Sequence, residues 1–196
     1  MVPLVLLLGP MASGKTSLCK SLFKTMADAA MKPFAIIQEN RRNPEGYPLE
    51  LRLVELPGGE ERFLAARGVF KAEQQSGEGN GRELNPFVFE KPAFVWACAK
   101  INQALAEGCG ALIVDEIGPL EVFKGDGLMP ALEEAANAEG LLLILSLRPS
   151  LEEALLGRLP KLTARPRMRV LPDRFREKNE LLFLGKDIIR HCQDKK

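Results

Sequence analysis

Short apolar segments alternate with amphipathic segments along most of this chain. Residues 3–8 and 111–114 are hydrophobic throughout, which is typical of strands whose two faces are both covered by helices. Elsewhere apolar side chains recur about every four residues, as on one face of a helix, for example Leu18, Leu22 and Met26. This alternation predicts an α/β fold with a mostly parallel twisted sheet flanked by helices. The other strands expected in the sheet are 34–37, 141–145 and 168–171.

A different pattern interrupts this alternation at about residues 44–90. Three leucines alternate with Glu50 and Arg52, and this period of two predicts a half-buried antiparallel strand. We therefore expect an inserted antiparallel hairpin. Its other parts are a Pro-Gly-Gly turn at 57–59, a return strand at 63–66, a mobile Gly-rich loop at 76–82 and a further short strand at 87–89.

The simple α/β pattern resumes at Pro92, a residue that suits the first turn of a helix. Phe94 and Ile101 share one face of this helix, and Gly108 can end it. Further helices are expected around 128–139 and from about 174 to 191. No internal repeat or long linker divides the chain, so residues 1–196 are predicted to form a single domain.

The charge balance does not point to a polyanionic partner. The chain has 27 Lys and Arg against 26 Asp and Glu, a formal net charge of +1, and the two signs are mixed. Neither nucleic acid nor an anionic membrane is therefore indicated as a partner, whereas a protein partner stays open. No apolar run approaches the roughly 20 residues that span a bilayer. The apolar start, residues 1–8, lacks the basic region and cleavage site of a signal peptide.

The cysteine pattern argues against a disulfide scaffold and against a zinc site. The four cysteines are far apart with no C-x-x-C pair, and His191 is the one histidine of the sequence. Reduced thiols are the favoured interpretation, and they are typical of a reducing compartment. We therefore expect a soluble cytoplasmic protein. The cysteines are Cys19, Cys98, Cys109 and Cys192.

A phosphate-binding loop is the most specific motif in the sequence, and it matches G-x-x-x-x-G-K-[ST]. Gly9 and Gly14 let the backbone turn so that successive N–H groups face the phosphates. Lys15 can reach the β- and γ-phosphates, and the Thr16 hydroxyl can bind Mg²⁺. The next helix presents its positive end to the anion, and Ser17 is a weaker candidate for contact with the α-phosphate. The predicted nucleotide-binding residues are Gly9, Pro10, Met11, Ala12, Ser13, Gly14, Lys15, Thr16 and Ser17.

A second candidate site follows the expected strand 111–114, which leads into Asp115 and Glu116. An aspartate at the carboxyl end of a buried strand beside a phosphate-binding loop can hold Mg²⁺. Glu116 is suited to polarise an attacking water. Without the loop, these would be ordinary exposed acids at a strand end. With it, we predict metal binding by Thr16 and Asp115, and catalysis by Glu116 and Lys15.

The adjacent Asp-Glu pair also predicts a strand order. It favours the RecA-like (ASCE) class of P-loop NTPases, in which one further strand separates the phosphate-loop strand from the acidic strand. Residues 141–145 are the natural occupant of that position, which would bring Ser146 and Arg148 near the γ-phosphate. Arg148 is thus a third candidate catalytic residue, because an arginine can stabilise charge on the transferred phosphoryl group. A solvated side chain at a strand end would explain it equally well.

The run Asp115–Glu121, together with Gly9–Thr16, resembles the small thermophile-type nucleoside-triphosphatase family of P-loop NTPases, which includes the vertebrate cancer-related nucleoside-triphosphatase. The segment Gln38–Arg67 looks like that family's inserted hairpin, and the segment 87–105 and Asn179 are also similar. The resemblance therefore covers most of the chain. It implies a single P-loop domain that hydrolyses ATP, GTP and other triphosphates to diphosphate and phosphate, slowly and with broad base tolerance.

By motif position, the resemblance also implies roles for individual residues. Many members of the family have Gly and Val where this chain has Ala12 and Ser13, and we expect this difference to be harmless because both positions offer backbone N–H groups. Members often have Asn-Arg where this chain has Asn179-Glu180, which puts any role of that motif in doubt. The implied roles are phosphate binding by Gly14, Lys15 and Thr16, metal binding by Asp115 and water activation by Glu116.

A nucleotide or nucleoside kinase is the first alternative. Kinases clamp the transferred phosphoryl group with arginines, and the segment 158–176 is rich in them, although a solvated basic segment explains it more simply. The arginines are Arg158, Arg165, Arg167, Arg169, Arg174 and Arg176.

A nucleotide-gated binding protein is the second alternative, with the hairpin and the 76–82 loop as switch or docking surfaces. A dedicated GTPase is disfavoured, because the sequence has no Asn/Thr-Lys-x-Asp motif to read guanine.

Overall fold

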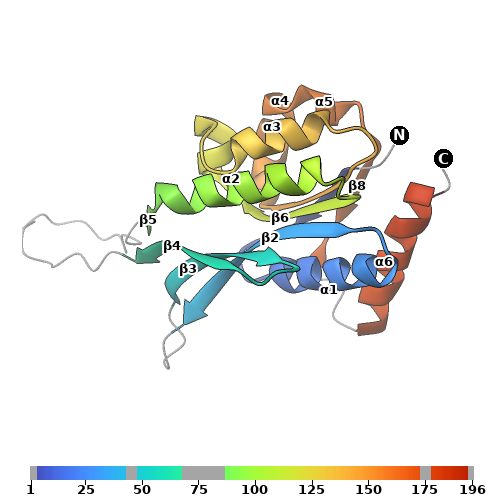
Figure 1. The fold of residues 1–196 in the computed structure, drawn as a ribbon, viewed down its shortest axis with the longest axis horizontal. Helices are drawn as coiled ribbons and strands as arrows, with labels where there is room; N and C mark the ends of the chain where they lie inside the picture. Colours follow the sequence, from blue (N-terminus) through green and yellow to red (C-terminus); the bar gives the residue numbers. More distant parts are fainter. Residues whose placement is uncertain (1–3, 43–47, 68–86, 173–177, 194–196) are drawn as a thin grey trace, which may run out of the picture.

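The structure is a computed structural model that describes residues 4–42, 48–67, 87–172 and 178–193 (Figure 1). Within these ranges, all strands belong to one eight-stranded sheet in the order β5-β4-β3-β2-β6-β7-β1-β8. The strands are β1 (Leu4–Leu8), β2 (Pro33–Arg42), β3 (Pro48–Leu56), β4 (Glu61–Arg67), β5 (Phe87–Phe89), β6 (Ala111–Ile117), β7 (Leu142–Leu147) and β8 (Arg167–Val170).

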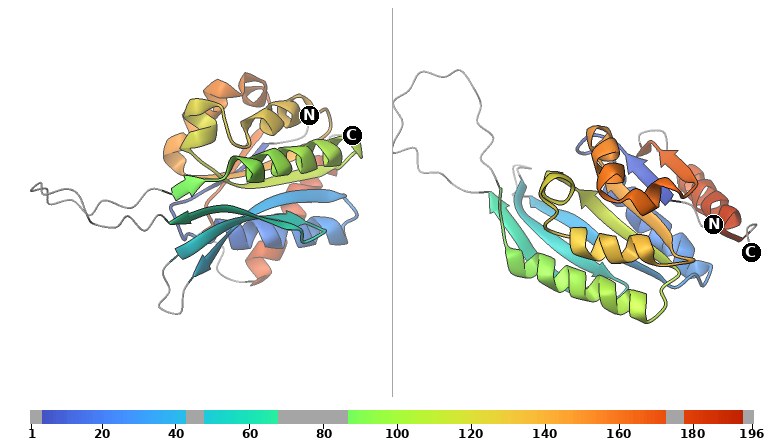
Figure 2. Two further views of the ribbon diagram at one scale, coloured as in Figure 1. Left: turned by 60° about the vertical axis from the view of Figure 1, so that its left-hand side comes forward. Right: turned by 90° about the horizontal axis from the view of Figure 1, so that it is seen from above.

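Helices cover both faces of this sheet. The first face carries α2 (Lys91–Ala106), α3 (Met129–Asn137), α4 (Glu152–Arg158) and α5 (Pro160–Thr163), and the second carries α1 (Lys15–Asp28) and α6 (Lys178–Gln193) (Figures 1 and 2). The short segments η1 (Leu120–Lys124) and η2 (Pro149–Leu151) are a π-helical and a 3₁₀ turn. This three-layer arrangement is the predicted α/β fold.

The two hydrophobic cores explain why β1 is apolar throughout. Leu4, Leu6 and Leu8 pack into the core beneath α2 and α3, whereas Val5 and Leu7 pack into the core against α1 and α6. Successive side chains of a strand point to opposite faces. A strand covered on both faces must therefore be hydrophobic at every position.

The strand order confirms the RecA-like prediction. The strands β2, β6, β7, β1 and β8 pair in parallel, and β7 lies between β1 and β6. Parallel strands end at the same edge of a sheet, so the segments that follow β1, β6 and β7 are neighbours there. The phosphate-binding loop, the Asp-Glu pair and Ser146 come from these three carboxyl ends.

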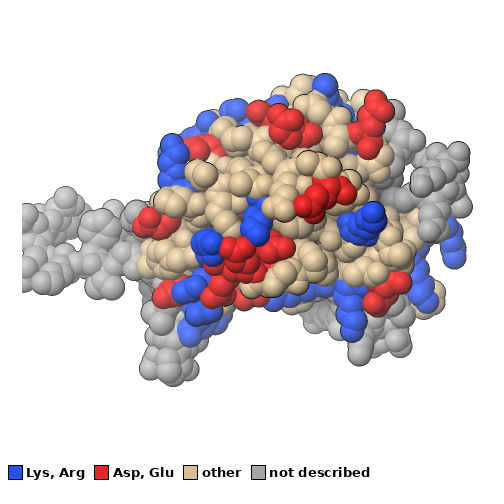
Figure 3. All heavy atoms as spheres, in the orientation of Figure 1, with Lys and Arg blue, Asp and Glu red and all other residues tan. Residues whose placement is uncertain are grey.

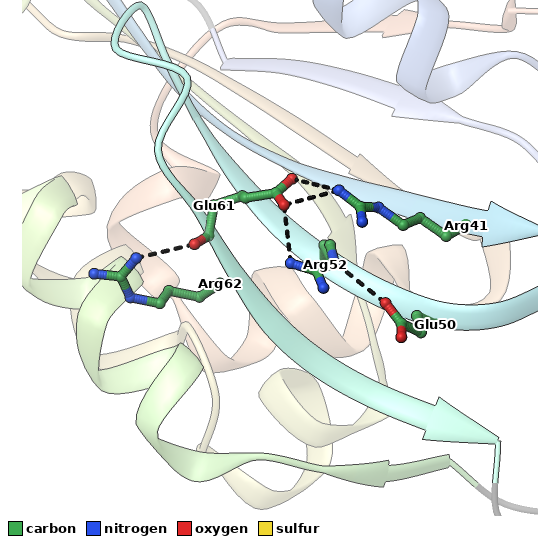
Figure 4. A network of polar contacts seen from close by, with 5 residues as sticks. All are labelled: Arg41, Glu50, Arg52, Glu61 and Arg62. Atoms are coloured by element: carbon green, nitrogen blue, oxygen red, sulfur yellow. Dashed lines mark hydrogen bonds and ion pairs between the residues drawn. The ribbon is translucent and has the colours of Figure 1, made fainter.

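The inserted hairpin extends the sheet beyond its parallel part. Strands β2, β3, β4 and β5 pair in antiparallel fashion, as the alternating leucines predicted. Leu51 and Leu53 face α2. The opposite face carries a charge network in which Glu61 accepts hydrogen bonds from Arg41 and Arg52 (Figure 4). Arg52 also donates a hydrogen bond to Glu50. This network links β2, β3 and β4 on the face away from α2.

Several segments differ from the sequence-based expectation. The strands β2 and β6 are longer than predicted, and the helices α4 and α5 and the turn η1 were not anticipated. The closing helix begins at Lys178 among the described residues, and 173–177 lie outside them. The predicted mobile loop at 76–82 also lies outside the described residues.

The described surface shows no dominant charge on the face drawn in Figure 3, where Lys and Arg side chains are interspersed with Asp and Glu side chains. Among the helices that the structure describes, none has the length and apolar character needed to cross a membrane.

Candidate active site

The phosphate-binding loop connects β1 to α1 and depends on its two glycines. A Cβ atom on Gly9 would lie 2.2 Å from the Ser13 hydroxyl oxygen, so no other residue fits there without rearrangement. Gly14 caps the N-terminus of α1 with a φ of 93°, a left-handed conformation that glycine adopts without steric cost. The loop therefore closes tightly on itself, and the free N–H groups of the first turn of α1 lie at its mouth.

We expected alanine in place of glycine at position 12 to be harmless, but the backbone conformation of Ala12 carries a steric cost. Its φ is 61°, which is the left-handed region. There the Cβ atom crowds the following carbonyl oxygen, at a cost of roughly 1–2 kcal/mol. The expectation considered only the N–H group that Ala12 offers, and it overlooked the backbone conformation.

Lys15 lies at the centre of the site with 3% of its surface exposed. Its ammonium group donates hydrogen bonds to the backbone oxygens of Gly9 at 3.1 Å and Pro10 at 2.9 Å. It also forms an ion pair with Glu116, 3.2 Å from a carboxylate oxygen. These three partners hold the cation beneath the loop.

Thr16 and Asp115 bring oxygen atoms from α1 and β6 together. The Thr16 hydroxyl donates a 2.7 Å hydrogen bond to one carboxylate oxygen of Asp115. The other oxygen accepts a 2.5 Å bond from the Ser146 hydroxyl and lies 3.8 Å from the Cys19 sulfur. Asp115 is 1% exposed, and this burial raises the pKa of its carboxyl group, while the hydrogen bonds from Ser146 and Thr16 oppose the rise.

A bulge in β6 allows two consecutive acids to face one site. The register with β7 advances by one extra residue between Val114 and Ile117, opposite Ser146. Within the bulge Glu116 has a φ of 58°, and its N–H group donates a 3.0 Å hydrogen bond to the Ser146 hydroxyl. In a regular strand, neighbouring side chains would point to opposite faces. Here Asp115 and Glu116 both border the same pocket.

That pocket, which we call the hairpin pocket, has a volume of about 370 Å³ and lies between the acidic pair and the α2 face of the inserted hairpin. Arg148 follows β7, is exposed, and lines the pocket together with Asp115 and Glu116. That Arg148 lies near the γ-phosphate stays a prediction. The described residues that line the pocket are Met11, Gln38, Asn40, Leu51, Leu53, Phe89, Phe94, Asp115, Glu116, Gly118, Pro119, Leu120, Glu121, Leu128 and Arg148.

The other predicted residues of the loop differ in their exposure. Met11 has 80% of its surface exposed at the tip of the loop, and Ser17 is exposed in the first turn of α1. The Ser13 hydroxyl is buried and makes no hydrogen bond within the described part of the chain. Pro10 contributes its carbonyl oxygen to Lys15.

Glu121 supports the site, and sequence reasoning did not assign it a function. Its buried carboxylate accepts hydrogen bonds from the N–H groups of Gly118, at 3.0 Å, and Leu128, at 3.3 Å. These bonds tie both ends of the segment 118–128 that follows Glu116. Burial raises the pKa of Glu121, and the backbone hydrogen bonds oppose that rise.

Replacing Glu121 with glutamine should destabilise the protein by about 1–3 kcal/mol. Both oxygens of a carboxyl group can accept hydrogen bonds, protonated or not, whereas an amide has one acceptor oxygen and leaves one of the two N–H groups unsatisfied. The raised pKa makes the contribution of Glu121 to stability largest below about pH 4.5, its ordinary value, and smaller as pH rises through its folded pKa. Denaturant unfolding at several pH values should therefore show a difference between wild type and Glu121→Gln that narrows from acidic to neutral pH. A constant difference would contradict this account.

The arginine-rich segment is largely engaged in structural contacts. Arg158 donates hydrogen bonds to the backbone oxygens of Val122 and Phe123, and Arg165 donates to those of Ala136, Ala138 and Leu141. Arg169 forms an ion pair with Glu152. Arg167 is exposed in β8, and Arg174 and Arg176 lie outside the described residues. Arg158 and Arg165 are therefore held by backbone carbonyl oxygens, and none of the four described arginines lines the hairpin pocket.

Comparison with known proteins agrees with this geometry. A family model described as NTPase matches residues 4–179. The solution structure of a human cancer-related nucleoside triphosphatase aligns over 100% of both chains with a TM-score of 0.69 and 18% identity. The crystal structure of THEP1 from the hyperthermophile Aquifex aeolicus aligns over 96% of each chain with a TM-score of 0.60 and 14% identity. At these identities the two structures show a shared fold. Among curated proteins, a search finds no significant match.

Proposed function

The chain belongs to the NTPase family, and from this premise we propose that it hydrolyses ATP, GTP and other nucleoside triphosphates to diphosphate and phosphate with Mg²⁺. The observation that carries the proposal is the position of Lys15, which is buried under the phosphate-binding loop and lies 3.2 Å from Glu116. One cation thus links the loop that would hold the phosphates to the acid that would activate water.

The loop and Lys15 would bind the β- and γ-phosphates. Backbone N–H groups of the loop and the first turn of α1 supply donors, and the helix terminus adds a favourable dipole. The ammonium group of Lys15 contacts two carbonyl oxygens and the Glu116 carboxylate. Phosphate oxygens would compete with Glu116 for this cation, and the carboxylate would then be free to bind water.

The oxygen atoms of Thr16 and Asp115 fit a magnesium ion. Mg²⁺ is typically held by one or two protein oxygens, with phosphates and water completing six ligands. The hydroxyl and the carboxylate already lie 2.7 Å apart. Within the described residues no group of three or more His, Cys, Asp or Glu side chains could form a complete metal cage, so substrate oxygens would have to contribute. When bound, the ion would neutralise charge on the phosphates.

Glu116 would act as the general base. Its side chain is 27% exposed, borders the hairpin pocket and is not one of the two proposed metal-binding residues. A water held by this carboxylate could attack the γ-phosphorus while Glu116 accepts its proton. The Ser146 hydroxyl accepts a hydrogen bond from the Glu116 N–H group and donates one to the Asp115 carboxylate. These bonds would fix the positions of the two acids relative to each other.

Broad base tolerance is part of the proposal. It is supported by the absence from the sequence of the Asn/Thr-Lys-x-Asp motif that reads guanine. We also propose that the protein acts in the cytoplasm, since Cys19, Cys98 and Cys109 are free thiols in the structure, as is typical of a reducing compartment.

Steady-state phosphate release from ATP, GTP, CTP and UTP, each with and without Mg²⁺, tests the proposal. We expect release from all four triphosphates at rates within about tenfold of one another, because phosphate contacts dominate binding. Chelation of the metal should stop release. Phosphate release that persists in excess chelator would contradict the assignment of Thr16 and Asp115.

Replacing Arg148 with alanine should slow hydrolysis and leave triphosphate binding nearly intact. An arginine supplied in cis to the γ-phosphate can be worth on the order of 10³ in rate, and because Arg148 is exposed we expect a loss of roughly 10- to 10³-fold. Single-turnover kinetics and a binding titration separate the two effects. Wild-type turnover in Arg148→Ala would show that this side chain does not approach the phosphate.

A further inference from the structure

The hairpin pocket is larger than hydrolysis requires. It shares Met11, Asp115, Glu116 and Arg148 with the site described above, but it extends from the acidic pair toward the hairpin, away from Lys15 and Thr16. A volume of about 370 Å³ lies within the range of roughly 300–1,000 Å³ that accommodates small organic ligands. An attacking water needs a small fraction of this space. The remaining space borders Asp115 and Glu116 and could hold a second substrate.

The walls of the pocket suit a flat ring. Phe94 from α2 and Phe89 from β5 both line it, with ring centroids 6.0 Å apart, and Leu51 and Leu53 add apolar surface from β3. Aromatic and aliphatic walls of this kind stabilise stacked rings. Most of the pocket is thus apolar, as in sites for small organic molecules.

Two amide side chains line the same pocket. Gln38 and Asn40 lie on the face of β2 that is turned to α2, with Glu39 on the opposite face, where it pairs with Lys20 of α1. An amide offers both a donor and an acceptor, and it can pair with the hydrogen-bonding edge of a nucleobase. The combination of a stacking wall with amide groups favours a heteroaromatic base over a simple alcohol.

The charged residues that line the pocket disfavour a phosphorylated ligand. The lining includes Asp115, Glu116 and Glu121, and Arg148 is the one cation among the described lining residues. Arg158 and Arg165, which could have formed a phosphate clamp, instead donate to backbone carbonyl oxygens. An additional phosphate would face three acids with little compensation. An uncharged ligand is therefore favoured.

We propose that the hairpin pocket binds an uncharged nucleoside and that its hydroxyl group accepts the γ-phosphoryl group. This inference rests on the proposed function, since it uses the same triphosphate site and the same base. The nucleoside hydroxyl would take the position of the attacking water beside Glu116. With the pocket empty, water fills that position and the protein hydrolyses its substrate.

The transfer balances without a further reactant. The hydroxyl oxygen of the nucleoside forms a bond to the γ-phosphorus as the bond from that phosphorus to the bridging oxygen breaks. The nucleoside diphosphate leaves with the electron pair, and Glu116 accepts the hydroxyl proton, which then passes to solvent. The products are a nucleoside monophosphate and a nucleoside diphosphate.

The test measures the fate of the γ-phosphate. The full chain is incubated with Mg²⁺ and γ-³²P-labelled ATP in the presence of adenosine, guanosine, cytidine, uridine or thymidine, and labelled nucleoside monophosphate is separated from free phosphate. We expect saturable label transfer to at least one nucleoside. No label in any of the five, with phosphate release intact, would overturn the inference and leave the hydrolase proposal standing. Absence of both products would overturn the hydrolase proposal itself.

Variants of β2 locate the site. The double variant Gln38→Leu, Asn40→Leu should reduce transfer by about tenfold or more, because it removes the groups that pair with the base, while phosphate release without nucleoside stays within about twofold of wild type. The matched control Glu39→Leu, on the other face of the same strand, should keep transfer. Equal transfer in the double variant and the control would overturn the assignment to this pocket. A parallel reaction offers the five nucleoside 5′-monophosphates as acceptors. Label transfer to these in preference to the nucleosides would overturn the inference that the ligand is uncharged.

Discussion

Replacing Lys15 with alanine should abolish measurable binding of ATP and GTP. The substitution removes a cation that is 3% exposed and lies beneath the loop that would hold the phosphates. Hydrogen bonds to charged groups contribute roughly 1.5–3 kcal/mol each. The loss of two such bonds to phosphate therefore weakens binding by about 10²- to 10⁴-fold. Titration calorimetry with Mg²⁺ and ATP measures the change directly.

Lys20→Ala is the matched control for this variant. Lys20 lies on the same helix α1, but it is half-exposed and pairs with Glu39 on the surface. We expect wild-type affinity in Lys20→Ala, since exposed ion pairs contribute little. Unchanged ATP affinity in Lys15→Ala, with folding verified by circular dichroism, would refute the assignment of the phosphate-binding loop.

The sequence was most informative where local pattern and topology agree. The apolar strand β1, the loop and the amphipathic helix α1 follow one another in the order that the motif requires. The Asp-Glu pair correctly predicted that β7 lies between β1 and β6. This position of β7 brings Ser146 within hydrogen-bonding distance of Asp115. Strand order could be predicted because the identity of the acidic pair carries information about the class of P-loop fold.

Other features depend on contacts that no local pattern encodes. The bulge at Asp115 and Glu116 is a shift of register against β7, and nothing in the apolar run before it signals an extra residue. The role of Glu121 depends on the N–H group of Leu128, seven positions away, after an unpredicted π-helical turn. The helices α4 and α5 are short, and Pro160 begins α5 only two residues after α4 ends, so no helical period emerges from the sequence.

The hairpin pocket also could not be predicted from local sequence pattern. Its walls come from β2, β3, β5, α2 and the segment after β6, and its chemistry is visible only when these elements meet. The alternating leucines predicted a half-buried strand, and they did so correctly. They could not show that part of the buried face borders a cavity beside Glu116.

Replacing Glu116 with glutamine should separate catalysis from binding. Glutamine keeps the shape of the side chain and can still hydrogen-bond a water, but it cannot accept the proton of that water. Loss of a positioned general base costs roughly 10²–10⁴ in rate. We therefore expect a comparable fall in phosphate release from Mg²⁺–ATP, measured under single-turnover conditions so that product release does not mask the chemical step.

Binding of the triphosphate should be unchanged or tighter in the same variant. Glu116 forms an ion pair with Lys15, so its carboxylate would compete with the phosphates for the ammonium group. The substitution removes that competition and one negative charge beside the bound anion. Glu116→Gln should consequently trap the Mg²⁺–triphosphate complex, which filter binding with labelled ATP would detect.

The control for Glu116→Gln is Glu139→Gln, because Glu139 is exposed in the turn before β7 and lies outside the hairpin pocket. This variant should hydrolyse ATP at the wild-type rate. If Glu116→Gln also hydrolyses ATP like wild type, then Glu116 is an acid at the end of a strand with no part in activating water. Its left-handed backbone and its ion pair with Lys15 would then serve only to organise the loop, and the general base would have to be sought elsewhere along the hairpin pocket.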